Sequence, residues 1–198
     1  MPAYAMLLKM VLRGRTLGVT EMKQTMTGWV FGAGLACLVA VAQVSAQGPV
    51  KVDMKDAQGN AIGTATLTKA AGGVNIALDL KGLTPGEHAL HVHMTAKCEG
   101  PAFTTAGGHF NPTAKKHGMK NPEGPHAGDM PNFTVAANGT VKASVVAPGV
   151  SLGMDANSMV MGGGTALVIH AKGDDMMTDP AGAAGDRIAC GIVPLMKM

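Results

Sequence analysis

The sequence predicts an all-β protein, an eight-stranded antiparallel Greek-key β-barrel or sandwich with two long functional loops. Three observations support this fold class. Short segments alternate apolar and polar residues, which is the period of a strand with one buried face. Turns rich in glycine, asparagine or proline separate these segments. No segment after residue 47 has a convincing helical period.

The strands fall into two groups of four. The first group is expected at residues 49–56, 61–69, 74–80 and 86–94, with turns at 56–60, 72–73 and 83–86. The second group is expected at residues 132–136, 141–146, 166–170 and 187–193, with a hairpin turn at 137–139.

Two polar segments, residues 95–130 and 171–186, interrupt the strands and are predicted to be loops. Loops longer than about 15 residues in a compact domain are usually functional or disordered. A disordered linker is the alternative for 95–130. A cysteine, three spaced histidines, an aspartate and the stiff Phe110-Asn-Pro112 favour a functional loop.

Residues 1–46 are predicted to be a cleaved signal peptide that precedes one domain over residues 47–198. The apolar run 29–42 follows Lys23, and Val44-Ser-Ala46 is a small-residue cleavage signature. A membrane anchor is the alternative, but the apolar run 29–42 is shorter than the roughly 20 apolar residues that a membrane span needs. We therefore expect a periplasmic or secreted domain without a stable membrane span, and a lipid on Cys37 is disfavoured by its place inside the run.

The positive charge of the chain belongs to the leader. Residues 1–46 hold four of the 16 basic residues and one of the 13 acidic residues, so twelve of each remain in the domain. A neutral domain gives no compositional reason to expect nucleic-acid binding. Two cysteines remain after cleavage, and in an exported chain they suggest one disulfide, Cys98–Cys190.

His91 and His93 are the first indication of a metal site. In a strand, positions i and i+2 share a face, so the two imidazoles point to one side and form half of a transition-metal site. All seven histidines follow the leader, and none lies in the first three expected strands. With Asp129 they provide more ligands than one tetrahedral site needs, which favours two metals.

Six motifs of the domain contain these histidines, Asp129, Arg187 and Cys190: Gly86-Glu-His-Ala-Leu-His-Val-His93, Ala106-Gly-Gly-His-Phe-Asn-Pro112, Lys116-His-Gly118, Pro125-His-Ala-Gly-Asp129, Leu167-Val-Ile-His170 and Gly185-Asp-Arg-Ile-Ala-Cys-Gly191. They occur in the order and spacing of the copper/zinc superoxide dismutases, and the chain resembles an exported bacterial member over residues 49–194. The resemblance implies dismutation of superoxide to oxygen and hydrogen peroxide, with one copper and one zinc per subunit. A monomer and a homodimer both remain open.

The resemblance also implies a role for each site residue. The copper ligands would be His91, His93, His109 and His170, and the zinc ligands His109, His117, His126 and Asp129. His109 would bridge the metals and, with Arg187 beside the copper, serve catalysis. Asp174 would hydrogen-bond one histidine of each metal. Cys98 and Cys190 match the family's disulfide, and His88 remains as a structural histidine.

The sequence is also compatible with two other functions. A non-catalytic protein that buffers copper or zinc could use the same scaffold, although it would not need Arg187. A structural or adhesive sandwich would require all six motifs to be accidental. The Met176-Met177 pair could meet Cu(I) during copper entry, but methionine as core filler or loose surface is the simpler interpretation.

Overall fold

The computed structural model describes residues 48–196, so the predicted leader lies outside the described residues. Within them the chain forms antiparallel strands and one short 3-10 helix, which confirms the predicted all-β fold. The strands are β1 Val50–Asp56, β2 Ala61–Ala70, β3 Gly73–Lys81, β4 Gly86–His88, β5 Leu90–His93, β6 Phe133–Val135, β7 Thr140–Ala147, β8 Ala166–His170 and β9 Arg187–Ile192. The 3-10 helix, η1, spans Thr104–Ala106. Over residues 48–196, no helix has the length and apolar character needed to cross a bilayer.

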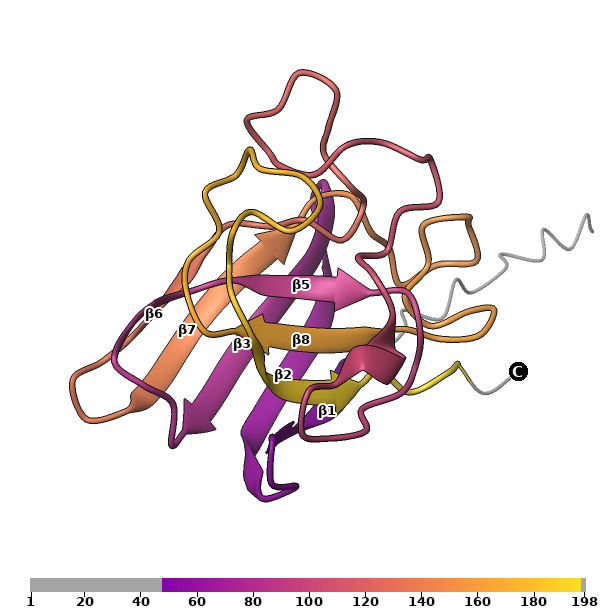
Figure 1. Ribbon diagram of the computed structural model, residues 1–198. Helices are drawn as coiled ribbons and strands as arrows, with labels where there is room; N and C mark the ends of the chain where they lie inside the picture. Colours follow the sequence, from indigo (N-terminus) through magenta and orange to yellow (C-terminus); the bar gives the residue numbers. More distant parts are fainter. Residues whose placement is uncertain (1–47, 197–198) are drawn as a thin grey trace, which may run out of the picture. The chain divides into compact units, whose positions relative to one another are not determined.

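Seven strands form one curved antiparallel sheet in the order β5-β8-β9-β1-β2-β3-β7, while β4 pairs with β6 (Figure 1). The single strand expected over 86–94 divides at Ala89, which raises the count among the described residues to nine. The reason lies in the backbone. The Ala89 N–H donates to the Lys172 carbonyl at 2.9 Å, and its own carbonyl accepts from His170 N–H at 3.0 Å. Ala89 therefore marks the point where the chain leaves one sheet and joins the other.

The main core lies on one face of the large sheet. In β1 the buried positions alternate, with Val52 and Met54 both fully buried. Every residue of β5 and β8 is buried because these strands are covered on both faces. Their inner face contributes Leu90 and Leu167 to the main core.

The outer face of β8 and β9 packs against the long loop instead. Val168 and Cys190 form a small second cluster with Phe103 and Ala106 of the η1 segment. His91 and His93 pair with Val168 and Ala166 in the antiparallel register, so their side chains share this outer face. The histidines of β5 therefore lie beneath the loop and away from the main core.

Main-chain hydrogen bonds fasten the 95–130 loop to β5. Met94 N–H donates to Gly108 O at 3.0 Å, and Phe110 N–H donates to Val92 O at 2.7 Å. The residue between these two contacts is His109, which the backbone places opposite His93. The 171–186 loop meets the first loop on the same side of the sheet (Figure 1), where Lys120 N–H donates to Met176 O at 3.0 Å.

Candidate metal centre

Four buried imidazoles converge between β5, β8 and the first loop. His91 and His93 are fully buried, His170 is 3% exposed and His109 is 8% exposed. The ring centroids of His91 and His109 are 4.0 Å apart, and those of His91 and His170 are 5.0 Å apart. One nitrogen from each of the four rings lies within 4.8 Å of the others.

One nitrogen on each of these rings is buried and has no hydrogen-bond partner. The four atoms are His91 Nδ1, His93 Nε2, His109 Nε2 and His170 Nε2. A buried polar atom without a partner costs about 1–3 kcal/mol, and a native structure with four in one place needs an explanation. A transition metal with imidazole ligands explains them, because it would take all four lone pairs.

The opposite nitrogens of these rings are held by fixed acceptors. His91 Nε2 lies 3.0 Å from Asp174 Oδ2, His93 Nδ1 lies 2.9 Å from Gly107 O, and His170 Nδ1 lies 3.1 Å from Gly185 O. Because a carboxylate or carbonyl oxygen can only accept, each of these nitrogens carries the hydrogen. The other nitrogen of each ring is then an unprotonated donor atom aimed at the centre of the cluster.

A second donor set lies directly beside the first and shares His109. Around Asp129 Oδ1, His109 Nδ1 lies at 2.9 Å, His117 Nδ1 at 3.1 Å and His126 Nδ1 at 3.4 Å. His109 Nδ1 and His126 Nδ1 are also 3.4 Å apart. Zinc–nitrogen bonds of 2.0–2.1 Å in a tetrahedron would separate the ligand atoms by about 3.3 Å. Three imidazoles and one carboxylate at these separations fit a closed tetrahedral zinc site.

The Asp129 carboxylate is fixed in its ionised form. Its Oδ2 accepts from the main-chain N–H groups of Gly118 at 2.8 Å and His126 at 3.0 Å. Burial alone would raise the pKa of Asp129, but hydrogen bonds from His109 and His117 outweigh burial and hold this pKa well below its ordinary value. Asp129 is therefore anionic at neutral pH.

Asp174 connects the two donor sets. Its Oδ2 lies 3.0 Å from His91 Nε2, and its Oδ1 lies 3.0 Å from His117 Nε2. Asn132 holds the Asp174 backbone through a paired contact: the Asn132 amide donates to Asp174 O at 2.9 Å and accepts from Asp174 N–H at 2.9 Å. The strand prediction for 132–136 did not reveal this contact, because the pattern treats Asn132 as an ordinary strand residue.

Gly182 is required where the second loop crosses the Asp174–His117 hydrogen bond. Its φ is +66°, and a Cβ there would collide with Asp174 Oδ1 and lie 2.8 Å from His117 Nε2. We expect Gly182→Ala to push the Asp174 carboxylate away from both histidines and to weaken binding of both metals about 10-fold or more. Chelator competition checks this, with Gly162→Ala as a control because its φ is +62° and its Cβ would meet nothing. Equal losses in both variants would contradict it.

Arg187 is held beside the four-imidazole cluster. Its Nη1 and Nη2 groups donate to Phe103 O and Gly107 O, both at 2.7 Å. Burial lowers the pKa of Arg187, but a guanidinium remains charged in proteins. Together with His109 and His170, Arg187 lines a hollow of about 440 Å³, so a small anion that enters it meets the arginine and two of the four clustered imidazoles together.

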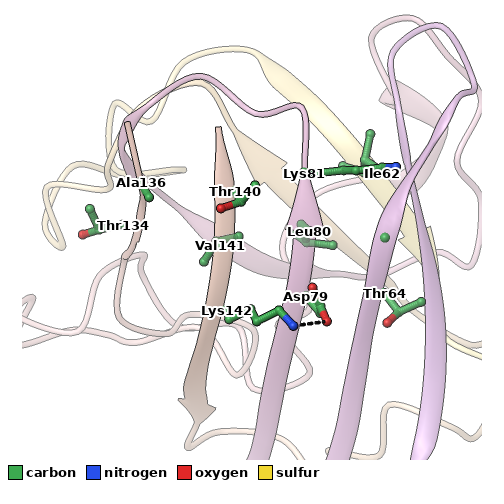
Figure 2. A pocket seen from close by; sticks show the side chains of 11 residues that line it. Ile62, Thr64, Asp79, Leu80, Lys81, Thr134, Ala136, Thr140, Val141 and Lys142 are labelled. Carbon is green, nitrogen blue, oxygen red and sulfur yellow. Dashed lines mark ion pairs between the residues drawn. The ribbon is translucent and has the colours of Figure 1, made fainter. Parts of the chain in front are cut away.

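A larger hollow of about 780 Å³ lies elsewhere, where β2, β3 and β7 run side by side (Figure 2). None of the histidines lines it. Its charged residues are Lys81 and the exposed Lys142–Asp79 ion pair at 3.2 Å, and such a pair contributes about 0–1 kcal/mol. This hollow lacks the chemistry of the metal centre.

The predicted disulfide is confirmed. Cys98 and Cys190 are bonded with a Cα–Cα distance of 5.6 Å. Cys190 lies on β9, the strand that begins at Arg187, and Cys98 lies in the loop whose Phe103 and Gly107 carbonyls hold that arginine. The bond therefore joins the arginine's strand to the segment that orients it.

His88 belongs to neither donor set. Its Nδ1 lies 2.7 Å from His170 O, and its Nε2 lies 2.8 Å from Thr84 O. It is 2% exposed and stacks beside Phe133. His88 thus supports the backbone behind His170.

The metal-free protein should lose stability when it is acidified. Burial lowers the pKa of His91 to about 3, of His93 to about 2 and of His170 to about 4. Because unfolded histidine titrates near 6.5, the unfolded chain binds more protons between roughly pH 6.5 and pH 4, and folding weakens as pH falls. Each histidine contributes at most about 1.4 kcal/mol per pH unit.

His117 has the opposite effect on how the stability of the metal-free protein depends on pH. Burial would lower its pKa, but hydrogen bonds to Asp129 and Asp174 raise it to about 9. Its contribution is complete below pH 6.5 and disappears as pH rises through about 9. We expect the urea midpoint of the metal-free protein to be highest near pH 6.5 and to fall towards both pH 4.5 and pH 9. A midpoint that rises between pH 6.5 and 4.5 would contradict these assignments.

The comparisons with known proteins agree with this chemistry. The family model described as "Copper/zinc superoxide dismutase (SODC)" matches residues 61–193. The chain is 50% identical over 143 residues to Superoxide dismutase [Cu-Zn] 2 of Aquifex aeolicus, covering 71% of this chain and 84% of the relative. It is 34% identical over 173 residues to Superoxide dismutase [Cu-Zn] of Escherichia coli K12, covering 80% and 95%.

Solved structures also resemble the chain. A SOD-like protein from Bacillus subtilis superposes with a TM-score of 0.70 at 36% identity, covering 72% of this chain and 97% of that one. The Cu/Zn superoxide dismutase from Brucella abortus gives a TM-score of 0.60 at 31% identity, covering 74% and 99%.

Proposed function

Because the chain belongs to the copper/zinc superoxide dismutase family, we propose that its two fused donor sets hold the two metals of that enzyme. Copper would bind His91, His93, His109 and His170, and zinc would bind His109, His117, His126 and Asp129. The observation that carries this proposal is the set of four buried, unpartnered ring nitrogens beside a three-histidine, one-carboxylate cluster. The reaction converts two superoxide ions and two protons into oxygen and hydrogen peroxide.

The metals divide the chemistry according to their electronic properties. When bound, copper supplies alternation between Cu(II) and Cu(I), taking an electron from one superoxide and returning it to the next, whereas zinc has no redox change. The protein's own residues would bind the anion and deliver the proton.

Arg187 is the residue we assign to anion binding. Two of its five N–H groups are used by Phe103 O and Gly107 O, so the guanidinium is fixed and still has donors for a ligand. Its charge and planar fork suit a small anion in a partly enclosed hollow. Superoxide would be oriented there beside the four ring nitrogens.

His109 is the residue we assign to proton delivery. Its Nε2 belongs to the copper-facing nitrogens, while its Nδ1 is held at 2.9 Å from Asp129. This fixed ring can hold a proton at Nε2 within the cluster and release it to the second superoxide.

The domain assignment and location belong to the same proposal. Residues 1–46 would be a cleaved signal peptide, and residues 47–198 would be the enzyme domain in the periplasm or outside the cell. The Cys98–Cys190 bond supports an oxidising compartment, because disulfides rarely persist in the cytosol.

Superoxide decay by the metal-loaded domain tests the proposal. Residues 47–198 are loaded with one equivalent each of copper and zinc, and decay is followed by stopped-flow absorbance. Superoxide dismutases are among the enzymes known to approach a diffusion ceiling of about 10⁸–10⁹ M⁻¹s⁻¹, and we expect a rate near it. The zinc-only protein is the control and should be inactive. Both metals bound without superoxide decay would instead indicate a metal-buffering protein.

A further inference from the structure

We propose that Asp179 is a second carboxylate that positions the zinc half of the centre, acting through His117 and His126. This inference rests on the zinc assignment proposed above. It differs from the role of Asp174, which contacts one histidine from each donor set. Asp179 contacts only the two zinc-side histidines that are not shared with copper.

One oxygen of Asp179 reaches both histidines. Asp179 Oδ1 accepts from the main-chain N–H of His117 at 2.8 Å, across 62 residues of sequence. The same oxygen lies 4.0 Å from His126 Nε2. Asp179 thereby fastens the second loop to the backbone of one zinc-side residue and places a negative charge beside the ring of another.

The direction of the His126 ring makes this charge relevant. His126 Nδ1 faces the zinc set, 3.4 Å from Asp129 Oδ1 and 3.4 Å from His109 Nδ1. When Nδ1 binds a metal, the ring's hydrogen must be on Nε2. That N–H then faces the Asp179 carboxylate, which attracts it directly or through one water molecule.

The turn that carries Asp179 is built to hold it in place. The Asp175 carboxylate accepts from Met177 N–H at 2.9 Å and from Thr178 N–H at 2.8 Å. Gly182 N–H donates to Thr178 O at 2.7 Å, which closes the turn behind Asp179. The Asp179 side chain is 45% exposed, so its ionised form is solvated and does not carry a large burial cost.

The electrostatic balance of the zinc half favours such a group. When zinc alone is bound, three neutral imidazoles and the single Asp129 carboxylate would leave a net positive charge on the zinc half. A carboxylate beside a ligand ring lowers the energy of that state and fixes the ring. Because Asp179 does not contact the copper-side rings His91, His93 and His170 in the described structure, its effect should be selective for zinc.

The test compares Asp179→Ala, Asp179→Asn and Glu123→Gln in the full mature domain. Glu123 is an exposed carboxylate in the first loop whose ion-pair partner is Lys116 at 4.0 Å, so its neutralisation controls for net charge. Zinc and copper dissociation constants are measured by chelator competition. The visible absorption of Co²⁺ bound in the zinc half reports the geometry of its ligands.

We expect Asp179→Ala to weaken zinc binding by about 10-fold or more and to shift the Co²⁺ bands, with copper affinity within about twofold of wild type. Asp179→Asn retains an acceptor for His117 N–H but lacks the charge, so it should restore part of the affinity and remain at least about threefold weaker. Glu123→Gln should bind zinc like wild type.

Zinc affinity within about twofold of wild type in both Asp179 variants would overturn the inference. So would an equal loss of zinc and copper affinity, since that would indicate general disruption. Should Asp179→Ala fail to fold, the Asn variant decides by the same criterion. Failure of the wild-type protein to bind zinc would instead refute the proposed zinc site, and this inference with it.

Discussion

His109→Ala is expected to abolish superoxide decay and to uncouple the two metals while leaving the β-fold intact. His109 contributes to both donor sets, with Nε2 among the four unpartnered ring nitrogens and Nδ1 beside Asp129. The variant would remove one donor from each set. We expect zinc affinity to fall by at least about 100-fold, more than the 10–100-fold typical of losing an outer partner.

The fold should survive because His109 contributes nothing to the main core. The neighbouring strands β1, β2 and β3 are held to that core by residues such as Val52, Leu67 and Ile76, all fully buried and remote in sequence from the loop. The loop itself is fastened by main-chain atoms of Gly108 and Phe110, which the substitution retains.

Circular dichroism, metal titration and stopped-flow superoxide decay measure these effects on one preparation. Asn111→Ala is the matched control, because Asn111 lines the same hollow but its side chain bonds only to the Lys115 backbone. The control should retain both metals and most of the activity. Wild-type zinc affinity and unchanged decay in His109→Ala would refute the shared-ligand assignment.

Removing the disulfide should have the largest effect on stability. In the chain-entropy description, a bond that closes a loop of about 92 residues stabilises the fold by about 4–5 kcal/mol, an upper figure. A Cys98→Ala/Cys190→Ala double variant avoids a lone buried thiol at Cys190, which is 1% exposed. We expect its free energy of urea unfolding to fall by an amount approaching this figure.

Activity should also fall, through Arg187. Without the bond, the segment that presents Phe103 O and Gly107 O loses its covalent link to β9, so the two acceptors of the guanidinium are held less firmly. Urea unfolding of the double variant and of reduced wild type, both metal-free, provides the measurement. A difference below about 1 kcal/mol from the oxidised protein would show that the loop is held by other contacts.

Much of the fold could be predicted from local patterns. Strands β1 to β3 and β7 have alternating buried and exposed positions, and this alternation is visible in their residues. Strand geometry likewise predicts that His91 and His93 point to the same face of β5. The division at Ala89 could not be predicted, because it depends on Lys172 O from a distant loop.

The supporting residues of the site were harder to predict than its histidines. Histidines stand out because of their residue type and spacing, and the family motifs specify their order. Asn132 contacts Asp174, 42 residues away in sequence, and Asp179 contacts His117, 62 residues away. Gly182 acts through its close approach to Asp174. No periodicity encodes such contacts. The only local signal is a polar or glycine residue in a loop, which is common to most loops.

The carbonyl groups that orient the rings of His93 and His170 could not be predicted from the sequence either. Gly107 O holds both His93 Nδ1 and Arg187 Nη2, and Gly185 O holds His170 Nδ1. Main-chain acceptors carry no residue identity, so only the folded arrangement of the two loops reveals them.

Diffraction from crystals of the copper- and zinc-loaded domain, recorded at the absorption edge of each metal, tests the central claim most directly. Two anomalous peaks are expected. The copper peak should lie within bonding distance of His91 Nδ1, His93 Nε2, His109 Nε2 and His170 Nε2, and the zinc peak beside His109 Nδ1, His117 Nδ1, His126 Nδ1 and Asp129 Oδ1. A single peak, or two peaks that do not share His109, would contradict the account.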